Sequence, residues 1–175
     1  MNVEVPTVSA DGGDAVTTDW STAFADFVVA YHADLLRLAY GMVGDIDTAA
    51  DVVQATWAAA WQHRFQLRDT SKARGWLLTI TANQARKALR RFRVRRVFTF
   101  NERITGVAER AEVDGQLDLV AAIQRLPLRD RQILVLRYGL GESSGEIARQ
   151  VGMSDSGVRV RVSRLLAALR KDLEE

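Results

Sequence analysis

The fold of this chain is decided by residues 143–164, which run Ser143-Ser-Gly-Glu-Ile-Ala-Arg-Gln-Val-Gly-Met-Ser-Asp-Ser-Gly-Val-Arg-Val-Arg-Val-Ser-Arg164. Ser143, followed three residues later by Glu146, predicts a capping box at the start of a short helix. Gly152 predicts the turn that ends this helix, and Ser154 predicts the cap of the next one. The pattern indicates a helix-turn-helix. The alternative is an ordinary helical hairpin whose arginines face water.

The second helix of this motif has one apolar face and one polar face. Val158, Val162, Leu165 and Leu169 recur at spacings of three and four, which predicts a buried stripe. The polar side chains around this stripe are candidates for contact with a DNA duplex, because arginine pairs with guanine in the major groove. These candidates are Ser154, Ser156, Arg159, Arg161, Ser163 and Arg164.

Two further helices are predicted before the motif. One runs over residues 117–126 and stops at Pro127, since the residue before a proline disfavours the helical region. The other covers residues 128–138. Residues 97–115 show only weak periodicity and are predicted to be a linker.

A strongly basic segment precedes this linker. Residues 70–101 contain nine Lys or Arg and no Asp or Glu. A helix is predicted to start at Ala73, to bury Trp76 and Leu77, and to display its cations. Such a charge run is most often a solvated face, and binding to a polyanion is the alternative. Arg outnumbers Lys by 21 to 3, which suits bidentate phosphate contacts, although GC-rich coding bias produces the same imbalance.

The first part of the chain is acidic, with ten acids against three bases in residues 1–69. Residues 1–20 lack periodicity and are predicted to be a disordered leader. An amphipathic helix is predicted from Thr22 to about Gly44. A second helix follows, capped by Asp45 or Asp47. Its predicted inward residues are Ala50, Val53, Trp57, Ala60 and Trp61. Its acidic face favours solubility or, alternatively, docking on a basic protein surface.

The predicted loop 62–71 carries the aromatic residue Phe65, which is a candidate for stacking on an unpaired base. The nearby Trp57, Trp61 and Trp76 have helical spacing and are predicted to lie in the core. His32 and His63 are predicted to be plain surface residues.

Composition excludes several classes of protein. The 175 residues are 47% hydrophobic, which is enough for two compact helical domains. No apolar run is long enough to span a bilayer and no signal peptide is present, so a cytoplasmic protein without membrane insertion is expected. The chain has no Cys, and it shows no phosphate-binding loop or nucleophile elbow. We therefore expect no enzymatic activity, no small-molecule substrate, no metal and no cofactor.

The order of these elements resembles that of an extracytoplasmic-function (group 4) sigma factor of bacterial RNA polymerase, over about residues 24–173. In the first half the resemblance is carried by Leu35-Leu-Arg-Leu-Ala39, Gly44-Asp-Ile-Asp-Thr-Ala-Ala-Asp-Val-Val-Gln-Ala-Thr-Trp57, Ala60-Trp61, and Ala73-Arg-Gly-Trp-Leu-Leu-Thr-Ile-Thr-Ala-Asn83. In the second half it is carried by Ile123-Gln-Arg-Leu-Pro-Leu-Arg-Asp-Arg-Gln132, Leu136-Arg-Tyr138, Glu146-Ile-Ala148, and Gly157-Val-Arg-Val-Arg-Val-Ser-Arg164.

The resemblance implies an all-α fold of two small helical domains joined by a linker, the second containing the helix-turn-helix. Residues 21–96 would form sigma region 2, residues 97–115 the linker, and residues 116–175 sigma region 4. Such a protein binds core RNA polymerase, directs promoter recognition and duplex opening, and is usually held inactive by an anti-sigma factor. The candidates listed above on the second helix of the motif would then contact the −35 element.

The resemblance also implies two further sets of site residues. Contacts with the clamp helices of the largest polymerase subunit fall on Asp47, Asp51, Val52, Val53 and Gln54. Region 4 would contact the flap of the second-largest subunit. Contacts with the −10 element fall on Phe65, Arg74, Trp76, Asn83, Arg86, Lys87, Arg90 and Arg91.

Three positions depart from the family pattern. Lys87 stands where an acid is common, Gly145 where a larger residue is usual, and Ser156-Gly157 where Gly-Thr is frequent. Gly157 is expected to cost about 1 kcal/mol of helix stability relative to Ala.

Two other functions remain open at this point. The first is a dimeric regulator whose helix-turn-helix binds an operator, but the front half lacks the long uncharged apolar face that a dimerising domain needs. The second is an adaptor that docks on polymerase or an anti-sigma factor without contacting DNA. Replacing Arg159 and Arg161 by Ala would leave promoter-directed transcription unchanged for an adaptor.

Overall fold

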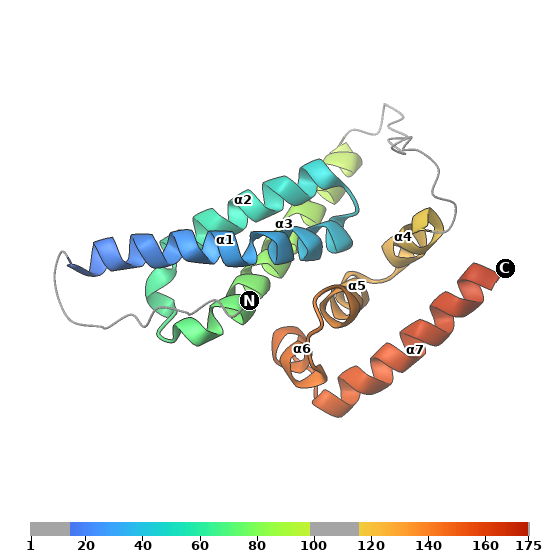
Figure 1. Cartoon of the computed structure of the whole chain (residues 1–175). Coiled ribbons are helices and arrows are strands. Elements are labelled where there is room, and N and C mark those ends of the chain that lie inside the picture. Colours follow the sequence, from blue (N-terminus) through green and yellow to red (C-terminus); the bar gives the residue numbers. More distant parts are fainter. Residues whose placement is uncertain (1–14, 99–115, 175) are drawn as a thin grey trace.

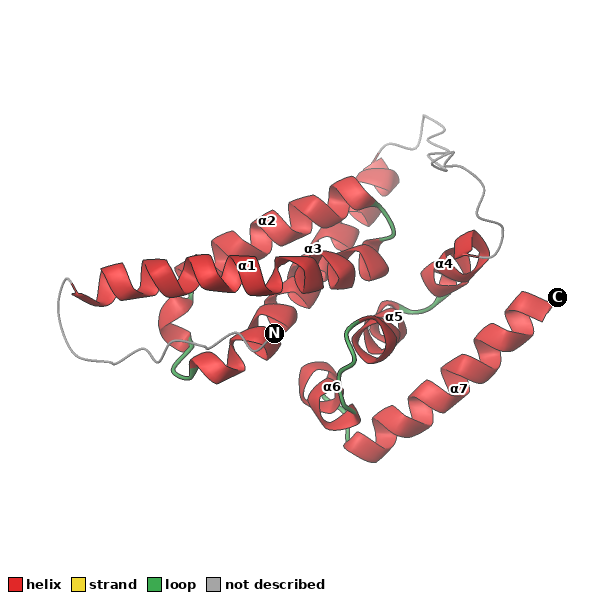
Figure 2. Ribbon diagram, viewed as in Figure 1, coloured by secondary structure: helices red, strands yellow, loops and turns green. Residues whose placement is uncertain are grey.

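The computed structural model describes residues 15–98 and 116–174, and regular secondary structure in these two ranges is entirely helical (Figures 1 and 2). We call residues 15–98 the N-terminal unit and residues 116–174 the C-terminal unit. Most of the predicted leader and most of the predicted linker lie outside the described residues. Within the two described ranges, no helix combines the length and the apolar character that crossing a bilayer requires.

The N-terminal unit contains three helices, namely α1 (Ala15–Val43), α2 (Ile46–Gln62) and α3 (Ala73–Phe98), each of which contacts the other two. Helix α1 begins seven residues before the predicted Thr22, so the prediction of a disordered leader through residue 20 is wrong for residues 15–20. Packing explains the difference, because Trp20 is buried and its ring meets Phe27 edge to face at 6.0 Å. A propensity argument alone had no means to detect this contact.

Helix boundaries in this unit follow from local chemistry. Gly44 has φ of 81°, which allows the tight turn after α1. Asp45 caps α2 and accepts a hydrogen bond from the Thr48 amide at 2.8 Å. Of the two predicted caps, Asp45 and Asp47, the first is therefore confirmed. The loop between α2 and α3 contains two short 3₁₀ turns, η1 (Arg64–Gln66) and η2 (Thr70–Lys72).

The C-terminal unit contains α4 (Gln116–Arg125), α5 (Leu128–Leu134), α6 (Ser144–Val151) and α7 (Asp155–Glu174). Pro127 separates α4 from α5, as predicted. Helix α5 continues directly into a π-helical turn, η3 (Val135–Gly139), where one continuous helix over residues 128–138 was expected. Single π-helical turns of this kind occur frequently at functional sites.

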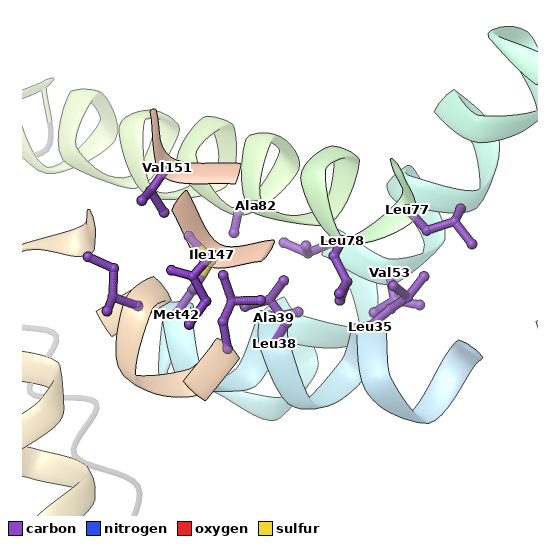
Figure 3. Close-up of a cluster of buried hydrophobic side chains, with 14 of the residues drawn as sticks. Leu35, Leu38, Ala39, Met42, Val53, Leu77, Leu78, Ala82, Ile147 and Val151 are labelled. Carbon is purple, nitrogen blue, oxygen red and sulfur yellow. The ribbon is translucent and has the colours of Figure 1, made fainter. Parts of the chain in front are cut away.

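The two units share the larger of two hydrophobic clusters, and the smaller one, formed by Ala122, Leu134, Leu165 and Leu169, lies within the C-terminal unit. Helix α6 contributes Ile147 and Val151, which lie beside Met42 and Leu38 of α1 and Ala82 of α3 (Figure 3). The sequence predicted two compact helical domains and left their relative placement open. In the structure α6, the first helix of the helix-turn-helix, contacts the basic helix α3, while α4, α5 and η3 contact α1.

Polar contacts fix this arrangement at the end of α1. The last carbonyl groups of a helix lack intrahelical partners. Here the Gln124 side chain donates to the Gly41 carbonyl at 3.0 Å, and Arg131 donates to the Met42 carbonyl at 3.0 Å. A Cβ atom on Gly41 would lie 2.3 Å from the Val135 side chain. Glycine at position 41 therefore permits the close approach of η3 to α1.

Candidate nucleic-acid and polymerase interfaces

The helix-turn-helix has the predicted geometry. Ser143 and Glu146 form the reciprocal capping box, and Gly152 ends α6 with φ of 63°. Arg129 of α5 donates to the Val151 and Gly152 carbonyls at 2.5 and 3.1 Å, which satisfies the end of α6 and ties the turn to α5.

Helix α7 starts with a second cap at Ser154. The Ser154 hydroxyl accepts a hydrogen bond from the Gly157 amide at 3.0 Å. A Cβ atom on Gly157 would lie 2.9 Å from that hydroxyl oxygen. The unusual glycine therefore makes room for the cap, which offsets part of its low helix propensity.

The structure places all six predicted −35 residues on the exposed part of α7 and its cap. Val158, Val162, Leu165 and Leu169 form the buried stripe, as predicted. A hollow of about 420 Å³ lies at the start of the helix. It is lined by Met153, Ser154, Ser156, Gly157, Val160, Arg161 and Arg164. Arg159 and Ser163 lie outside this hollow but remain exposed.

Arg161 differs from the other candidates because its partner is a buried carboxylate on another helix, whereas Arg159 pairs at 2.6 Å with the exposed Asp155 of its own helix. The Nε and a terminal nitrogen of Arg161 donate to the two carboxylate oxygens of Asp130 at 2.7 and 2.6 Å. Asp130 has only 3% of its side chain exposed, whereas Arg161 has 44%. These hydrogen bonds raise the pKa of Arg161 above its usual value. The pair links α7 to α5, so Arg161 orients the helix in addition to lining the hollow.

Val160 is a residue of this face that the sequence reasoning missed. It is 50% exposed and lines the hollow together with Ser154, Arg161 and Arg164. Within the described part of α7 the other exposed side chains are polar or Ala. The signal was available in the sequence, because the run Val158, Val160, Val162 alternates while a helix needs spacings of three and four.

The predicted −10 residues separate into exposed and occupied groups. Phe65 is 72% exposed on η1, and Asn83, Lys87, Arg90 and Arg91 are exposed along α3. Trp76 is half-buried against the core, as its spacing predicted.

Arg74 and Arg86 each donate to residues of both units. Arg74 donates to Asp34 at 2.9 Å, to the Leu140 carbonyl at 3.2 Å, and to the buried carboxylate of Glu142. Arg86 donates to the buried Gln132 side chain at 2.5 Å. Burial, together with the nearby charge of Arg129, lowers the pKa of Arg86. In this arrangement both arginines connect the two units.

The loop before α3 has its own polar framework. Asp69 caps η2, accepting from the Ser71 hydroxyl at 2.6 Å and the Ser71 amide at 3.0 Å, and it pairs with Lys72 at 2.9 Å. The hydrogen bond from the Ser71 side chain is the largest cause of a lowered pKa for Asp69, at about 2. The same loop contains Arg64, which sequence reasoning missed and which lies over the rings of Trp61 and Phe65.

The predicted polymerase-binding set is divided by the structure. Asp47, Asp51 and Gln54 are exposed on α2, whereas Val52 and Val53 are buried in the core. The prediction that the two valines belong to a binding surface is therefore wrong for this structure. The buried stripe of α2 is Ala49, Val52, Val53, Thr56 and Ala60. It is rotated from the predicted stripe, which had included Ala50 and Trp61, both of which are exposed.

Comparison with known proteins gives two family matches. Residues 27–96 match the model of sigma-70 region 2, and residues 116–169 match that of sigma-70 region 4. The chain is 35% identical over 152 residues to the ECF RNA polymerase sigma factor SigL of Mycobacterium tuberculosis, covering 82% of this chain and 85% of that protein. It is 27% identical over 157 residues to the ECF sigma factor SigX of Bacillus subtilis, covering 82% and 80%.

Solved structures show the same fold. The sigma factor RpoE, in complex with the anti-sigma factor NepR from Bartonella quintana, superposes with a TM-score of 0.73 at 24% identity, covering 86% of this chain and 96% of that one. CnrH, in complex with the cytosolic domain of CnrY, gives a TM-score of 0.65 at 25% identity, covering 88% and 89%. The chain therefore belongs to the extracytoplasmic-function sigma factors of the sigma-70 family, which bind core RNA polymerase and direct promoter recognition, duplex opening and transcription initiation.

Proposed function

We propose that the three exposed faces divide the work of this sigma factor. The acidic face of α2, with Asp47, Asp51 and Gln54, docks on the clamp helices of polymerase. The Phe65 loop and the basic helix α3 capture the −10 element, and α7 contacts the −35 element in the major groove. The protein acts in the cytoplasm, and it has no catalytic activity of its own.

The observation that carries this assignment is the segregation of charge over exposed helices. Lys87, Arg90 and Arg91 form a cationic run on α3, and the exposed carboxylates of Asp47 and Asp51 lie on the neighbouring α2, where Asp51 lines one pocket together with Lys87 and Arg91. Cations hold separated phosphate backbones, and exposed carboxylates suit a basic protein surface. The two partners would therefore bind adjoining surfaces, which meet at the pocket between α2 and α3.

The −35 contacts rest on the exposed face of α7. Arg159 and Arg164 supply donors for guanine, and Val160 supplies an apolar surface for the methyl group of thymine. Arg161 has less freedom, because Asp130 already accepts two of its hydrogen bonds. It contributes mainly by holding α7 in place.

The contact between the two units, which we call the closed arrangement, supports control by an anti-sigma factor. Arg74 and Arg86 face the C-terminal unit, so they reach DNA only after the two units separate. A partner that binds the closed arrangement would hold the protein inactive. CnrH, which shares this fold, was solved in complex with the cytosolic domain of CnrY.

Run-off transcription tests the proposal. Core polymerase is incubated with and without the protein on a pool of upstream fragments from its own genome. New discrete start sites are expected, and alignment of the fragments gives both promoter elements. Failure to bind core and to produce any transcript would contradict the proposal.

Matched variants then assign the faces. Asp47→Asn with Asp51→Asn is expected to weaken binding to core polymerase. Arg90→Ala with Arg91→Ala is expected to preserve core binding but to reduce the salt dependence of DNA binding, since each phosphate contact releases counterions. Val29→Ala removes an exposed valine of α1 and serves as the control.

A further inference from the structure

Arg64 lies between two aromatic rings at the protein surface. The central carbon of its guanidinium is 4.9 Å from the centre of the Trp61 ring and 4.3 Å from the centre of the Phe65 ring. One terminal nitrogen also donates to the Trp61 carbonyl at 2.9 Å. These three contacts restrict the guanidinium, and through it they restrict the Phe65 ring.

The inner end of this assembly is anchored in the N-terminal unit. Trp61 meets Phe24 edge to face at 5.1 Å, and Phe24 meets Trp57 in the same way at 5.5 Å. Edge-to-face aromatic pairs stabilise a fixed relative orientation. The position of Arg64 is therefore set by two helices, α1 and α2, although it lies in a loop.

The outer end of the assembly is Phe65. Arg64 covers part of its ring, yet 72% of the residue stays exposed. Folding gains little from so exposed a phenylalanine, because the apolar area remains in water. An immobilised, exposed aromatic surface is what an unpaired base needs, since the base regains by stacking what it loses when the duplex opens.

The surroundings of Phe65 suit the backbone of a single strand. A groove of about 620 Å³ begins at the next residue, Gln66, and its lining includes the cations Arg68 and Lys72, the indole of Trp76, and the carboxylates of Asp69, Glu142 and Glu146. Asp69 pairs with Lys72 at 2.9 Å, and Glu142 pairs with Arg74. The Arg68 and Lys72 side chains are both exposed. Cations beside an aromatic platform are the combination that binds single-stranded nucleic acid.

We propose that Arg64 is a positioning residue that holds the Phe65 ring for stacking on an unpaired base of promoter DNA. The inference rests on the proposed function of the Phe65 loop and adds the group that orients it. Arginine suits this role because its guanidinium is planar and lies 4.9 and 4.3 Å from the centres of the two rings. The compact ammonium of lysine carries the same charge but has no plane to stack.

The test uses holoenzyme assembled from core polymerase and the full chain. The probe is a fluorescently labelled nontemplate-strand oligonucleotide carrying the −10 element found by run-off transcription. Anisotropy gives its affinity, and a series of probes each replaces one base by an abasic site. The proteins compared are the wild type, Phe65→Ala, Arg64→Ala, Arg64→Lys, the double variant Phe65→Ala with Arg64→Ala, and Arg68→Ala.

At one position of the strand, removing the base is expected to lower wild-type affinity about tenfold, the usual effect of one stacked base. Phe65→Ala is expected to abolish this loss. Arg64→Ala and Arg64→Lys are both expected to reduce it to about twofold or threefold. In the double variant the Arg64 substitution has no further effect. Arg68→Ala is expected to weaken binding of every probe equally and to lower the salt slope.

The positioning role is contradicted if Arg64→Lys keeps the wild-type response to the abasic series, because charge would then suffice. It is also contradicted if Arg64→Ala weakens binding equally at every position and in the Phe65→Ala background. Failure of the wild type to direct run-off transcription is a different outcome, and it would remove the proposed function itself. Thermal unfolding of each variant verifies that the surface substitutions leave the fold intact.

Discussion

Arg74 is expected to stabilise the contact between the two units, and its removal provides a quantitative test. The carboxylate of Glu142 is almost fully buried, with 4% of its side chain exposed, and Arg74 is its cationic partner with 32% exposed. The Arg74→Ala substitution leaves this carboxylate with one side-chain hydrogen bond among the described residues, from Gln150 at 3.4 Å. Removing one partner of a fully buried ion pair costs about 3–5 kcal/mol.

Solvent access to Arg74 reduces this figure, since a partly exposed pair is screened. We therefore expect Arg74→Ala to lower the free energy of unfolding by about 2 kcal/mol. For a chain of this length, that loss of free energy corresponds to a thermal unfolding midpoint lower by roughly 4–8 °C. Glu142→Gln keeps the shape, removes the charge and leaves Arg74 paired with Asp34, so its cost should be nearer 1 kcal/mol.

The assay is urea unfolding followed by circular dichroism at 222 nm, which reports all helices. Tryptophan fluorescence reports the N-terminal unit, because all four tryptophans lie there. The decisive quantity is the coupling between the two substitutions. Arg74→Ala should cost markedly less in the Glu142→Gln background, where no unpaired buried charge remains. If the two effects simply add, the ion pair does not hold the units together and the reasoning is refuted.

Three further predictions concern other parts of the structure. Replacing one −35 thymine by deoxyuridine should lower the affinity of the wild-type holoenzyme for promoter DNA about fourfold, the value of one buried methyl group. Val160→Ala should make the affinity insensitive to this replacement. Equal losses of affinity in both proteins would contradict the contact. Gly41→Ala should destabilise the protein by about 1–3 kcal/mol in thermal unfolding through its clash with Val135, and Val135→Ala should recover part of this loss. The carboxyl of Asp69, followed by NMR, should titrate near pH 2 instead of its ordinary 3.8, and Ser71→Ala should raise that pKa. Because the pKa is lower in the folded state, the stabilisation from this carboxylate is complete above about pH 4 and is lost as the pH falls toward 2; an ordinary titration would contradict it.

Much of the fold was predictable because its signals are local. The capping box at Ser143, the cap at Asp45, the turn at Gly152 and the stop at Pro127 are confirmed. Each depends on atoms within about four residues, so a single sequence contains the information. The start of α1 was not predictable in this way, because it depends on the burial of Trp20.

The candidate sites were predictable as surfaces but less so as individual contacts. Phe65, Lys87, Arg90 and Arg91 are exposed, as their pattern indicates, whereas Arg74 and Arg86 are partly buried. Val53 is buried as its own helical spacing predicted, and Val52 is buried because α2 presents a different stripe to the core than the sequence favoured. A rotation of about one residue moves a helical side chain by 100°, so a surface residue and a core residue are easily exchanged.

The sequence by itself determined the helices, their caps, the helix-turn-helix and the segregation of charge, since these depend on neighbours along the chain. Only the tertiary structure decided which cations are available. Arg161 pairs with Asp130, 31 residues away, and Arg74 pairs with Glu142, 68 residues away. Such pairs depend on how helices pack, and packing brings together residues whose separation along the chain carries no periodic signal. The same packing joined the two units in a shared core.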